Sequence, residues 1–157
     1  MSNILLRNVE RDDLPIFFKH QQNPEANHMA AFTSKDPSDW NSFLSHWSNI
    51  LANKDIVKQS IMVENNVVGH ISCFEQFGET EVSYWIGKDY WGKGIATNAL
   101  QEFLKVITIR PLHARAAKDN IGSLKVLEKC GFIITGEDKG FSNARGGEVE
   151  EFILTLS

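Results

Sequence analysis

The chain has 157 residues, of which 42% are hydrophobic, and this size predicts a single domain over residues 1–157 with a buried core. It carries 16 basic and 20 acidic residues, a net charge of −4 without long runs of one sign, which argues against nucleic acid and anionic membranes as main partners. No charged leader precedes an apolar core at the start, and no segment approaches the roughly 20 apolar residues of a membrane span. A cytoplasmic protein is expected.

The N-terminal part is predicted to form one strand and two helices. Residues 4–9 are typical of a strand, and the acidic residues and proline that follow favour a helix over residues 14–22, which Pro24 breaks. Residues 33–39 form a polar turn that caps a second helix. The apolar side chains of this helix recur near helical spacing: Trp40, Phe43, Leu44, Trp47 and Leu51.

The central part is predicted to form strands and a further helix. Residues 60–64 and 67–77, joined by Asn65-Asn66, are typical of a hairpin, because asparagine tolerates the positive φ of a tight turn. A fourth strand follows Gly78 and ends at Gly87. An amphipathic helix comes next, with these apolar residues on one face: Ile95, Ala96, Ala99, Leu100, Phe103, Leu104 and Ile107.

The C-terminal part continues the alternation of strand and helix. Residues 112–117 predict a strand, residues 121–130 a helix, and residues 132–135 and 149–156 a final pair of strands. Residues 136–147 are expected to form a long polar loop between that pair. The predicted fold class is therefore α/β (α+β), with a mixed, mostly antiparallel sheet of about six to seven strands flanked by about four helices.

The segment between the fourth strand and the amphipathic helix, residues 90–97, carries the clearest chemical signal. Gly92 and Gly94 have no Cβ, so the chain can turn sharply and approach a ligand closely. The unpaired N–H groups of the first helical turn then point at that ligand from the positive end of the helix dipole. A phosphorylated ligand is predicted here.

Two other phosphate-binding motifs match part of the same segment. Residues 87–94 follow the Walker A spacing as far as Lys93, but Gly94 stands where a serine or threonine must hold magnesium. A dinucleotide-binding motif would need glycine or alanine at Thr97 and a longer chain after the loop. Both motifs lack their confirming context, and a nucleotide-binding protein is the weakest alternative.

Three segments in the same order resemble the GNAT superfamily of N-acetyltransferases. Residues 91–96 resemble its acyl-CoA pyrophosphate loop, Gln/Arg-x-x-Gly-x-Gly/Ala; residues 81–87 are similar to the preceding strand, and residues 120–132 to the later Asn-x-x-Ser/Ala helix that ends in Gly-Phe. The resemblance is strongest to the branch of the ribosomal-protein N-terminal acetyltransferases, with Tyr-Trp-Gly-Lys-Gly in the loop and serine on the later helix. It implies acetyl-CoA as co-substrate and direct attack on the thioester by a primary amine, either a protein or peptide N-terminus or a small amine.

By this resemblance, the acetyl-CoA site comprises the end of the fourth strand, the loop and the start of the later helix: Trp85, Ile86, Trp91, Gly92, Lys93, Gly94, Ile95, Ala96, Thr97, Asn120 and Ser123. Trp91 departs from the Gln or Arg of the pattern, and backbone amides are expected to make the phosphate contacts. A purely structural alternative makes Asn120 the N-cap of its helix and Ser123 an early-turn polar residue. Tyr84 is more typical of a core residue than of a site.

Acetyl transfer needs an uncharged amine, a stabilised tetrahedral oxyanion and a protonated thiolate leaving group. Glu81 lies where some members of the superfamily keep a general base, with a solvated surface carboxylate as the alternative. A main-chain N–H within residues 84–86 is the simplest oxyanion donor, provided that the fourth and fifth strands separate. Many members use a tyrosine as general acid, and the matching position is Leu127, which leaves Ser123 or a water as candidates.

The acceptor and the assembly stay open at this level. Cys73, Cys130 and the five histidines show no spacing typical of a metal site, and no metal is expected. The resemblance places the acceptor between residues 20–40 and 136–147, whose mixture of side chains suits a peptide, an amino sugar, a polyamine or another small amine. A catalytically silent acyl-CoA-binding module, consistent with Leu127, is the main alternative to an enzyme, and either a monomer or a homodimer is expected.

Overall fold

The computed structural model describes residues 3–157, which form one seven-stranded sheet in the order β1-β2-β3-β4-β5-β7-β6. The strands are β1 (Ile4–Asn8), β2 (Val57–Val63), β3 (Asn66–Gln76), β4 (Glu79–Ile86), β5 (Leu112–Ala117), β6 (Ile133–Ser142) and β7 (Gly147–Leu156). All neighbouring strands are antiparallel except β4 and β5, which are parallel. The predicted fold class is confirmed.

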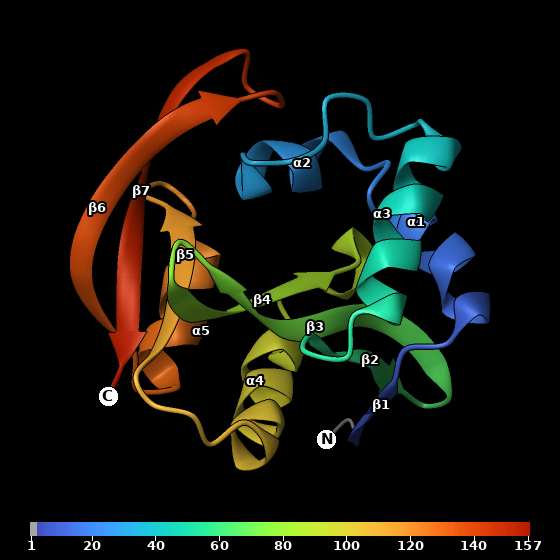
Figure 1. Cartoon of the computed structure of the whole chain (residues 1–157), viewed down its shortest axis with the longest axis horizontal. Coiled ribbons are helices and arrows are strands. Elements are labelled where there is room, and N and C mark those ends of the chain that lie inside the picture. Colours follow the sequence, from blue (N-terminus) through green and yellow to red (C-terminus); the bar gives the residue numbers. More distant parts are fainter. Residues whose placement is uncertain (1–2) are drawn as a thin grey trace.

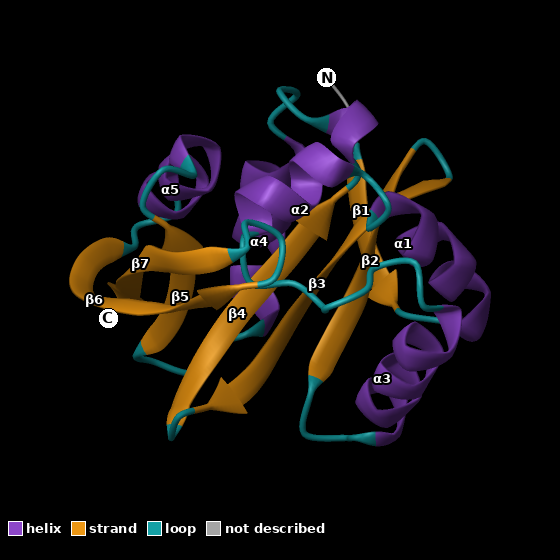
Figure 2. Cartoon of the chain, turned by 90° about the horizontal axis from the view of Figure 1, so that it is seen from above, coloured by secondary structure: helices purple, strands orange, loops and turns teal. Residues whose placement is uncertain are grey.

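Helices cover both faces of the sheet (Figure 1). The helices α1 (Leu14–His20), α2 (Pro24–Ala30) and α3 (Trp40–Ala52) lie on one face, and α4 (Ile95–Val106) and α5 (Ile121–Lys129) lie on the other. Short 3-10 turns, η1 (Arg11–Asp13) and η2 (Lys88–Tyr90), precede α1 and α4. Seen from above, α1 and α3 gather over the β1 to β3 half of the sheet, and α5 lies over the β5 to β7 half (Figure 2).

The prediction for Pro24 was wrong, because Pro24 begins a helix instead of only ending one. Proline at the first helical position costs no hydrogen bond, and its restricted φ suits the helix start. Asn23 is the N-cap of α2, and its side-chain oxygen accepts the N–H of Ala26 at 2.9 Å. The segment after α1 therefore supplies a short helix to the wall of the site.

Two further local predictions need correction. The turn between β2 and β3 has its positive φ values at Glu64 (49°) and Asn65 (68°), one position earlier than expected. Residues 136–147 form a hairpin instead of a long loop, because β6 runs to Ser142 and pairs with β7 as far as Gly147. As the last strand of the sheet, β6 has one neighbour only, so most of its side chains face water and the strand can be polar.

The start of α1 is held by a buried carboxylate, that of Asp13. Arg7 donates two hydrogen bonds to it, at 2.7 and 2.8 Å, and the Ser60 hydroxyl and the Glu10 N–H donate one each, at 2.7 and 2.9 Å. Burial by itself would raise the pKa of Asp13, but these hydrogen bonds outweigh it and the pKa is lowered. The carboxylate links β1, β2 and η1 in its charged form.

Two apolar clusters determine which way the residues of β4 face. The larger one, with Phe103 of α4 and Leu127 of α5, lies under α4 and α5; the smaller one, with Phe17 of α1, lies under α1 and α3. Alternation along a strand sends successive side chains to opposite faces. Val82, Tyr84 and Ile86 therefore face α4 and α5, and Glu81, Ser83 and Trp85 face α1 to α3.

The strands β4 and β5 meet at one point and then separate. Glu81 of β4 and His113 of β5 are the one registered pair between these strands in the described chain. Beyond it, β4 continues to Ile86 with β3 as its only sheet partner. The expected separation of the fourth and fifth strands is therefore present, and it leaves main-chain groups on one edge of β4 free for a ligand.

Candidate active site

A cavity of about 1100 Å³ opens where β4 and β5 separate. Its walls come from α2, β4, the loop before α4, the start of α5 and β6. It gathers almost all of the predicted site residues: Glu81, Trp85, Ile86, Trp91, Gly92, Gly94, Ile95, Ala96, Thr97, Asn120 and Ser123. Lys93 is the exception, since its side chain extends toward the ring of Tyr90, with the ammonium 5.8 Å from the ring centroid.

The loop before α4 presents a series of free main-chain donors. The N–H groups of residues 92–97 donate to no other residue between 3 and 157, and the first helical bond of α4 runs from the Asn98 N–H to the Gly94 carbonyl at 3.1 Å. Gly92 and Gly94 both have φ of 76°, and no atom lies within 4 Å of a Cβ placed on either. The two glycines therefore allow a left-handed backbone and leave open space at the cavity, and the free N–H groups have the arrangement that suits an anion.

Trp91 fastens this loop to the end of β4. Its indole N–H donates to the carbonyl of Ile86 at 2.8 Å, and the ammonium of Lys88 lies 4.9 Å from the centroid of its ring. The single polar atom of the Trp91 side chain is thereby engaged within the protein. Contacts with a phosphate are left to the backbone amides, while the ring forms part of the cavity wall.

Asn120 joins α5 to α2 across the cavity. Its side-chain oxygen accepts the N–H of Ser123 at 3.2 Å, which makes Asn120 the N-cap of α5. Its amide nitrogen donates to the carbonyl of Met29 at 3.2 Å. The structural role that the sequence allowed for Asn120 is present, and the second amide proton is left for a ligand.

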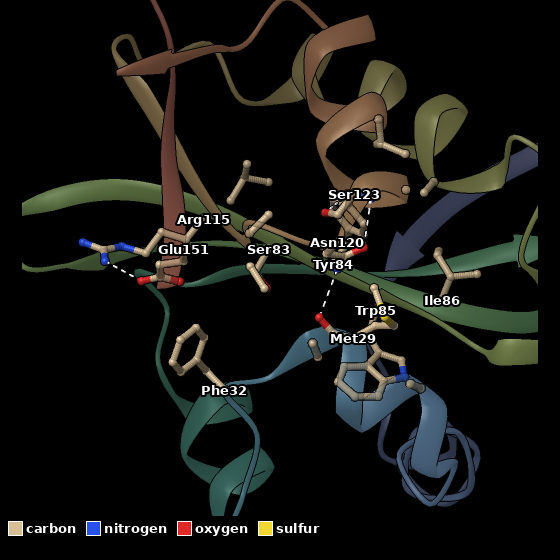
Figure 3. A pocket seen from close by; sticks show the side chains of 18 of the residues that line it. Met29, Phe32, Ser83, Tyr84, Trp85, Ile86, Arg115, Asn120, Ser123 and Glu151 are labelled. Atoms are coloured by element: carbon tan, nitrogen blue, oxygen red, sulfur yellow. Dashed lines mark hydrogen bonds and ion pairs between the residues drawn. The ribbon is translucent and has the colours of Figure 1, made fainter. Parts of the chain in front are cut away.

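A pair of hydroxyl groups lies on the α5 side of β4. The hydroxyls of Tyr84 and Ser123 are 2.7 Å apart, and burial raises the pKa of Tyr84 to about 12 (Figure 3). Leu127, where many relatives of the resembled superfamily have tyrosine, is 1% exposed and belongs to the core instead of the cavity wall. The prediction that Tyr84 is a core residue did not anticipate this pair of hydroxyl groups. Strand alternation together with the position of Ser123 in the first turn of α5 was the available signal.

Glu81 lies on the opposite face of β4 and is 4% exposed, so the solvated alternative for this carboxylate was wrong. Burial raises its pKa, and the guanidinium of Arg115, with Nε 3.5 Å from a Glu81 oxygen, partly opposes that rise. Gln76 contributes an amide N–H at 3.4 Å. A buried carboxylate with a raised pKa is suited to accept a proton near neutral pH.

Arg115 connects Glu81 to the last two strands. Its Nη1 lies 2.8 Å from Glu151 (Figure 3) and 2.9 Å from Asp138, and the centroid of the Phe77 ring is 4.9 Å from its guanidinium carbon. Three carboxylates thus share one guanidinium, which leaves an excess of negative charge at this end of the cavity. Sequence analysis missed this group because its members come from four different strands.

The two segments expected to enclose the acceptor meet at the tip of the β6–β7 hairpin, which arches toward α2 (Figure 1). Ser142 donates its hydroxyl proton to the carbonyl of Ala31, and Arg145 donates to the carbonyl of His28 at 2.8 Å. Ala31 has φ of 65° and ψ of −55°, and the Phe32 N–H donates to the Ala30 carbonyl at 2.7 Å, which defines a classic γ-turn. This strained turn leads directly into Phe32 in the cavity wall.

Residues 3–157 contain neither a membrane-spanning helix nor a cluster of metal ligands. No helix in that range is long and apolar enough to span a membrane. In the same range, no three His, Cys, Asp or Glu side chains converge as metal ligands.

Comparison with known proteins identifies the family. The family model described as "Acetyltransferase (GNAT) domain" matches residues 3–133. The chain is also 22% identical, over 98% of its own length and 92% of the relative's, to an uncharacterized N-acetyltransferase, p20, of Bacillus licheniformis.

Solved structures share the fold at low identity. RimJ of Mycobacterium smegmatis in complex with CoA-disulfide is 19% identical, with a TM-score of 0.76 and coverage of 98% of this chain and 81% of that one. Spermidine N-acetyltransferase from Vibrio cholerae in complex with CoA and spermine is 18% identical, with a TM-score of 0.77 and coverage of 97% and 95%. A Rim-type enzyme and another acetyltransferase are thus similar to the chain to the same degree, and the fold does not separate these branches.

The matched residues include most of the chain: all of β1 to β5, the loop of free N–H donors and α5. Nucleotide-binding alternatives lose their support, because the loop that motivated them lies within this match. The chain belongs to the GNAT family of acetyltransferases, whose members use acyl-CoA.

Proposed function

We propose that the protein transfers the acetyl group of acetyl-CoA to a primary amine by direct attack of the amine on the thioester. One observation carries this proposal: the free N–H groups of residues 92–97 and the buried carboxylate of Glu81 open into the same cavity. The first group suits a diphosphate and the second suits a proton acceptor. The gap between β4 and β5 joins them.

The donor would enter through that gap. The diphosphate of acetyl-CoA would accept hydrogen bonds from the N–H groups of residues 92–97, with Ile95, Ala96 and Thr97 in the first turn of α4. The pantetheine arm would pair with the free edge of β4 near Trp85 and Ile86, beside Asn120. The thioester would then lie next to Ser123 in the gap between β4 and β5, through which Glu81 on the other face of β4 could be reached.

Glu81 would act as the general base. The amine arrives as an ammonium ion, and its proton would pass to the Glu81 carboxylate directly or through a water. A main-chain N–H of residues 84–86, on the edge of β4 without a strand partner, would hold the oxyanion. Ser123 would donate a hydrogen bond to the departing sulfur.

Two acceptor classes have support. The sequence of residues 90–94 and the presence of Ser123 favour the branch that acetylates N-terminal amines of ribosomal proteins, and such an enzyme would work in the cytoplasm. A small cationic amine is the second class, favoured by the three carboxylates around Arg115, which would attract additional positive charge.

The test combines binding with turnover. Isothermal titration with acetyl-CoA, ATP and NAD should show micromolar binding of acetyl-CoA alone, in the usual range for enzyme substrates of about 1 μM to 1 mM. A thiol-release assay should then show amine-dependent turnover with a panel that contains an alanine-initiated peptide and spermidine. Binding without release from any amine would favour the silent acyl-CoA module, and absence of acetyl-CoA binding would overturn the proposal.

A further inference from the structure

The hydroxyl groups of Tyr84 and Ser123 form an isolated pair in the cavity wall. Tyr84 projects from β4 and Ser123 from the first turn of α5, and their oxygens are 2.7 Å apart (Figure 3). In the chain from residue 3 to 157, neither side-chain oxygen has another hydrogen-bond partner. The pair therefore contains two hydroxyl protons but one hydrogen bond, which leaves one proton free for a ligand.

The chemistry of the two groups decides which proton is free. A phenol is a stronger acid than an aliphatic alcohol, so it is the better donor of the two, and a buried donor without an acceptor is costly. Burial also raises the pKa of Tyr84 to about 12, so the phenol keeps its proton at the pH of ordinary assays. Either oxygen can be the donor at this distance, and these properties favour Tyr84 as the donor, with the Ser123 O–H free to point elsewhere.

Other hydroxyl groups of the cavity are placed differently. Ser83 lies on the opposite face of β4, Tyr90 lies at the end of η2, and Thr97 lies in the first turn of α4. Leu127 contributes no polar atom and is buried in the core. On the α5 side of the gap between β4 and β5, the hydroxyl groups are therefore those of Tyr84 and Ser123.

We propose that Tyr84 is a positioning residue whose hydroxyl donates to Ser123 Oγ and thereby directs the Ser123 O–H at the sulfur that leaves acetyl-CoA. This inference rests on the proposed acetyl transfer. The ammonium first gives one proton to Glu81, which passes it to water. The neutral nitrogen then forms a bond to the carbonyl carbon and gives its second proton to Glu81. The carbon–sulfur bond breaks with its electron pair retained by sulfur. The thiolate accepts the hydrogen bond from Ser123 and takes a proton from water after release.

The first experiment measures the thiol of bound CoA and needs no acceptor. The ultraviolet absorbance of the thiolate is titrated with pH for CoA in solution and for CoA bound to the wild type, Tyr84→Phe and Ser123→Ala. The wild type should lower the thiol pKa relative to free CoA, because a donated hydrogen bond favours the thiolate. Both variants should bring the value back toward that of free CoA by similar amounts.

The matched control removes a hydroxyl from an equivalent pair elsewhere in the sheet. Thr135 of β6 and Thr155 of β7 have hydroxyl oxygens that are also 2.7 Å apart, and neither lines the cavity. Thr135→Val should leave the pKa of the bound thiol unchanged. Circular dichroism verifies that each variant is folded before it is titrated.

The second experiment measures turnover with the amine of the panel that releases thiol fastest. Tyr84→Phe should lower kcat about tenfold with little change in the KM for acetyl-CoA, since one hydrogen bond to a developing charge is lost. Ser123→Ala should lower kcat at least as much, and the double variant should match Ser123→Ala, because Tyr84 acts through Ser123.

The outcomes separate this inference from the proposed function. An unchanged thiol pKa and unchanged kcat in Tyr84→Phe, with Ser123→Ala impaired, would overturn the role of Tyr84 and leave acetyl transfer intact. A loss of kcat that adds to that of Ser123→Ala in the double variant would also contradict it. If the wild type did not bind CoA, the proposed function itself would be overturned.

Discussion

Replacement of Arg115 by glutamine tests the electrostatics of the site most directly. The guanidinium lies within 3.5 Å of Glu81, Glu151 and Asp138 and is the cation that lowers the pKa of Glu81 against the effect of burial. In Arg115→Gln, the glutamine side chain can still donate hydrogen bonds through its amide, but it carries no charge. The pKa of Glu81 should therefore rise further.

The size of the change follows from the contacts. An opposite charge at this range lowers the pKa of a carboxyl group by about one to three units. The guanidinium is shared with Glu151 and Asp138, so its loss should raise the pKa of Glu81 by only part of that effect. A raised pKa leaves more of Glu81 protonated at a given pH, and a protonated base is inactive. The acidic limb of kcat/KM should therefore move to higher pH by about one pH unit, with activity recovered at alkaline pH.

The assay is thiol release as a function of pH for the wild type, Arg115→Gln and a control. Lys118, just past the end of β5, is a suitable control because it contacts Glu137 at 2.7 Å and Glu150 at 2.8 Å outside the cavity wall. Lys118→Gln should leave the limb in place. If Arg115→Gln lost activity equally at every pH, or kept the limb of the wild type, Glu81 would not be the base that this limb reports.

Four further variants test the loop and the scaffold. Gly94→Ala and Gly78→Ala both place a Cβ at φ of 76°, and each should lower the free energy of unfolding by about 1 kcal/mol. Only Gly94→Ala should also weaken acetyl-CoA binding in calorimetry, on the order of tenfold, and Gly78→Ala is its control. Asp13→Asn should destabilise the protein by about 2 kcal/mol at neutral pH. Because the folded pKa of Asp13 is lowered, this difference in urea unfolding should shrink as the pH falls through that pKa, and a constant difference would contradict it. Ser142→Ala leaves the carbonyl of Ala31 without its hydrogen bond, so it should lower the free energy of unfolding by about 1–3 kcal/mol and speed amide exchange at the γ-turn. Unaltered exchange at the turn would contradict this prediction.

Much of the fold could be predicted because its elements have strong periodicity. The helix α4 has one apolar face, and β4 is rich in β-branched and aromatic residues and ends before Gly87, so both follow from the local sequence. The loop between them was equally clear, since Gly92 and Gly94 directly precede a helix start. These features depend on residues that are neighbours in the chain.

The predictions that were wrong concern elements whose structure depends on distant parts of the chain. The helix α2 is short, and its start at Pro24 had the same sequence signature as a break. The polar strand β6 was taken for a loop because it lies at the edge of the sheet, where hydrophobic alternation is weak. In both cases the decisive information was the position of a neighbouring element.

The sequence by itself determined the family resemblance, the glycine-rich loop before α4 and the choice of Glu81 and Ser123 as candidates, because each depends on residue types at short spacing. The tertiary structure alone decided that Tyr84 contacts Ser123 and that Arg115 contacts Glu81, Asp138 and Glu151. These partners are far apart in the chain, and which of them meet depends on the order of the strands. The pKa values of the site follow from the same contacts, because burial and charge at a carboxylate or a phenol are properties of the packed sheet.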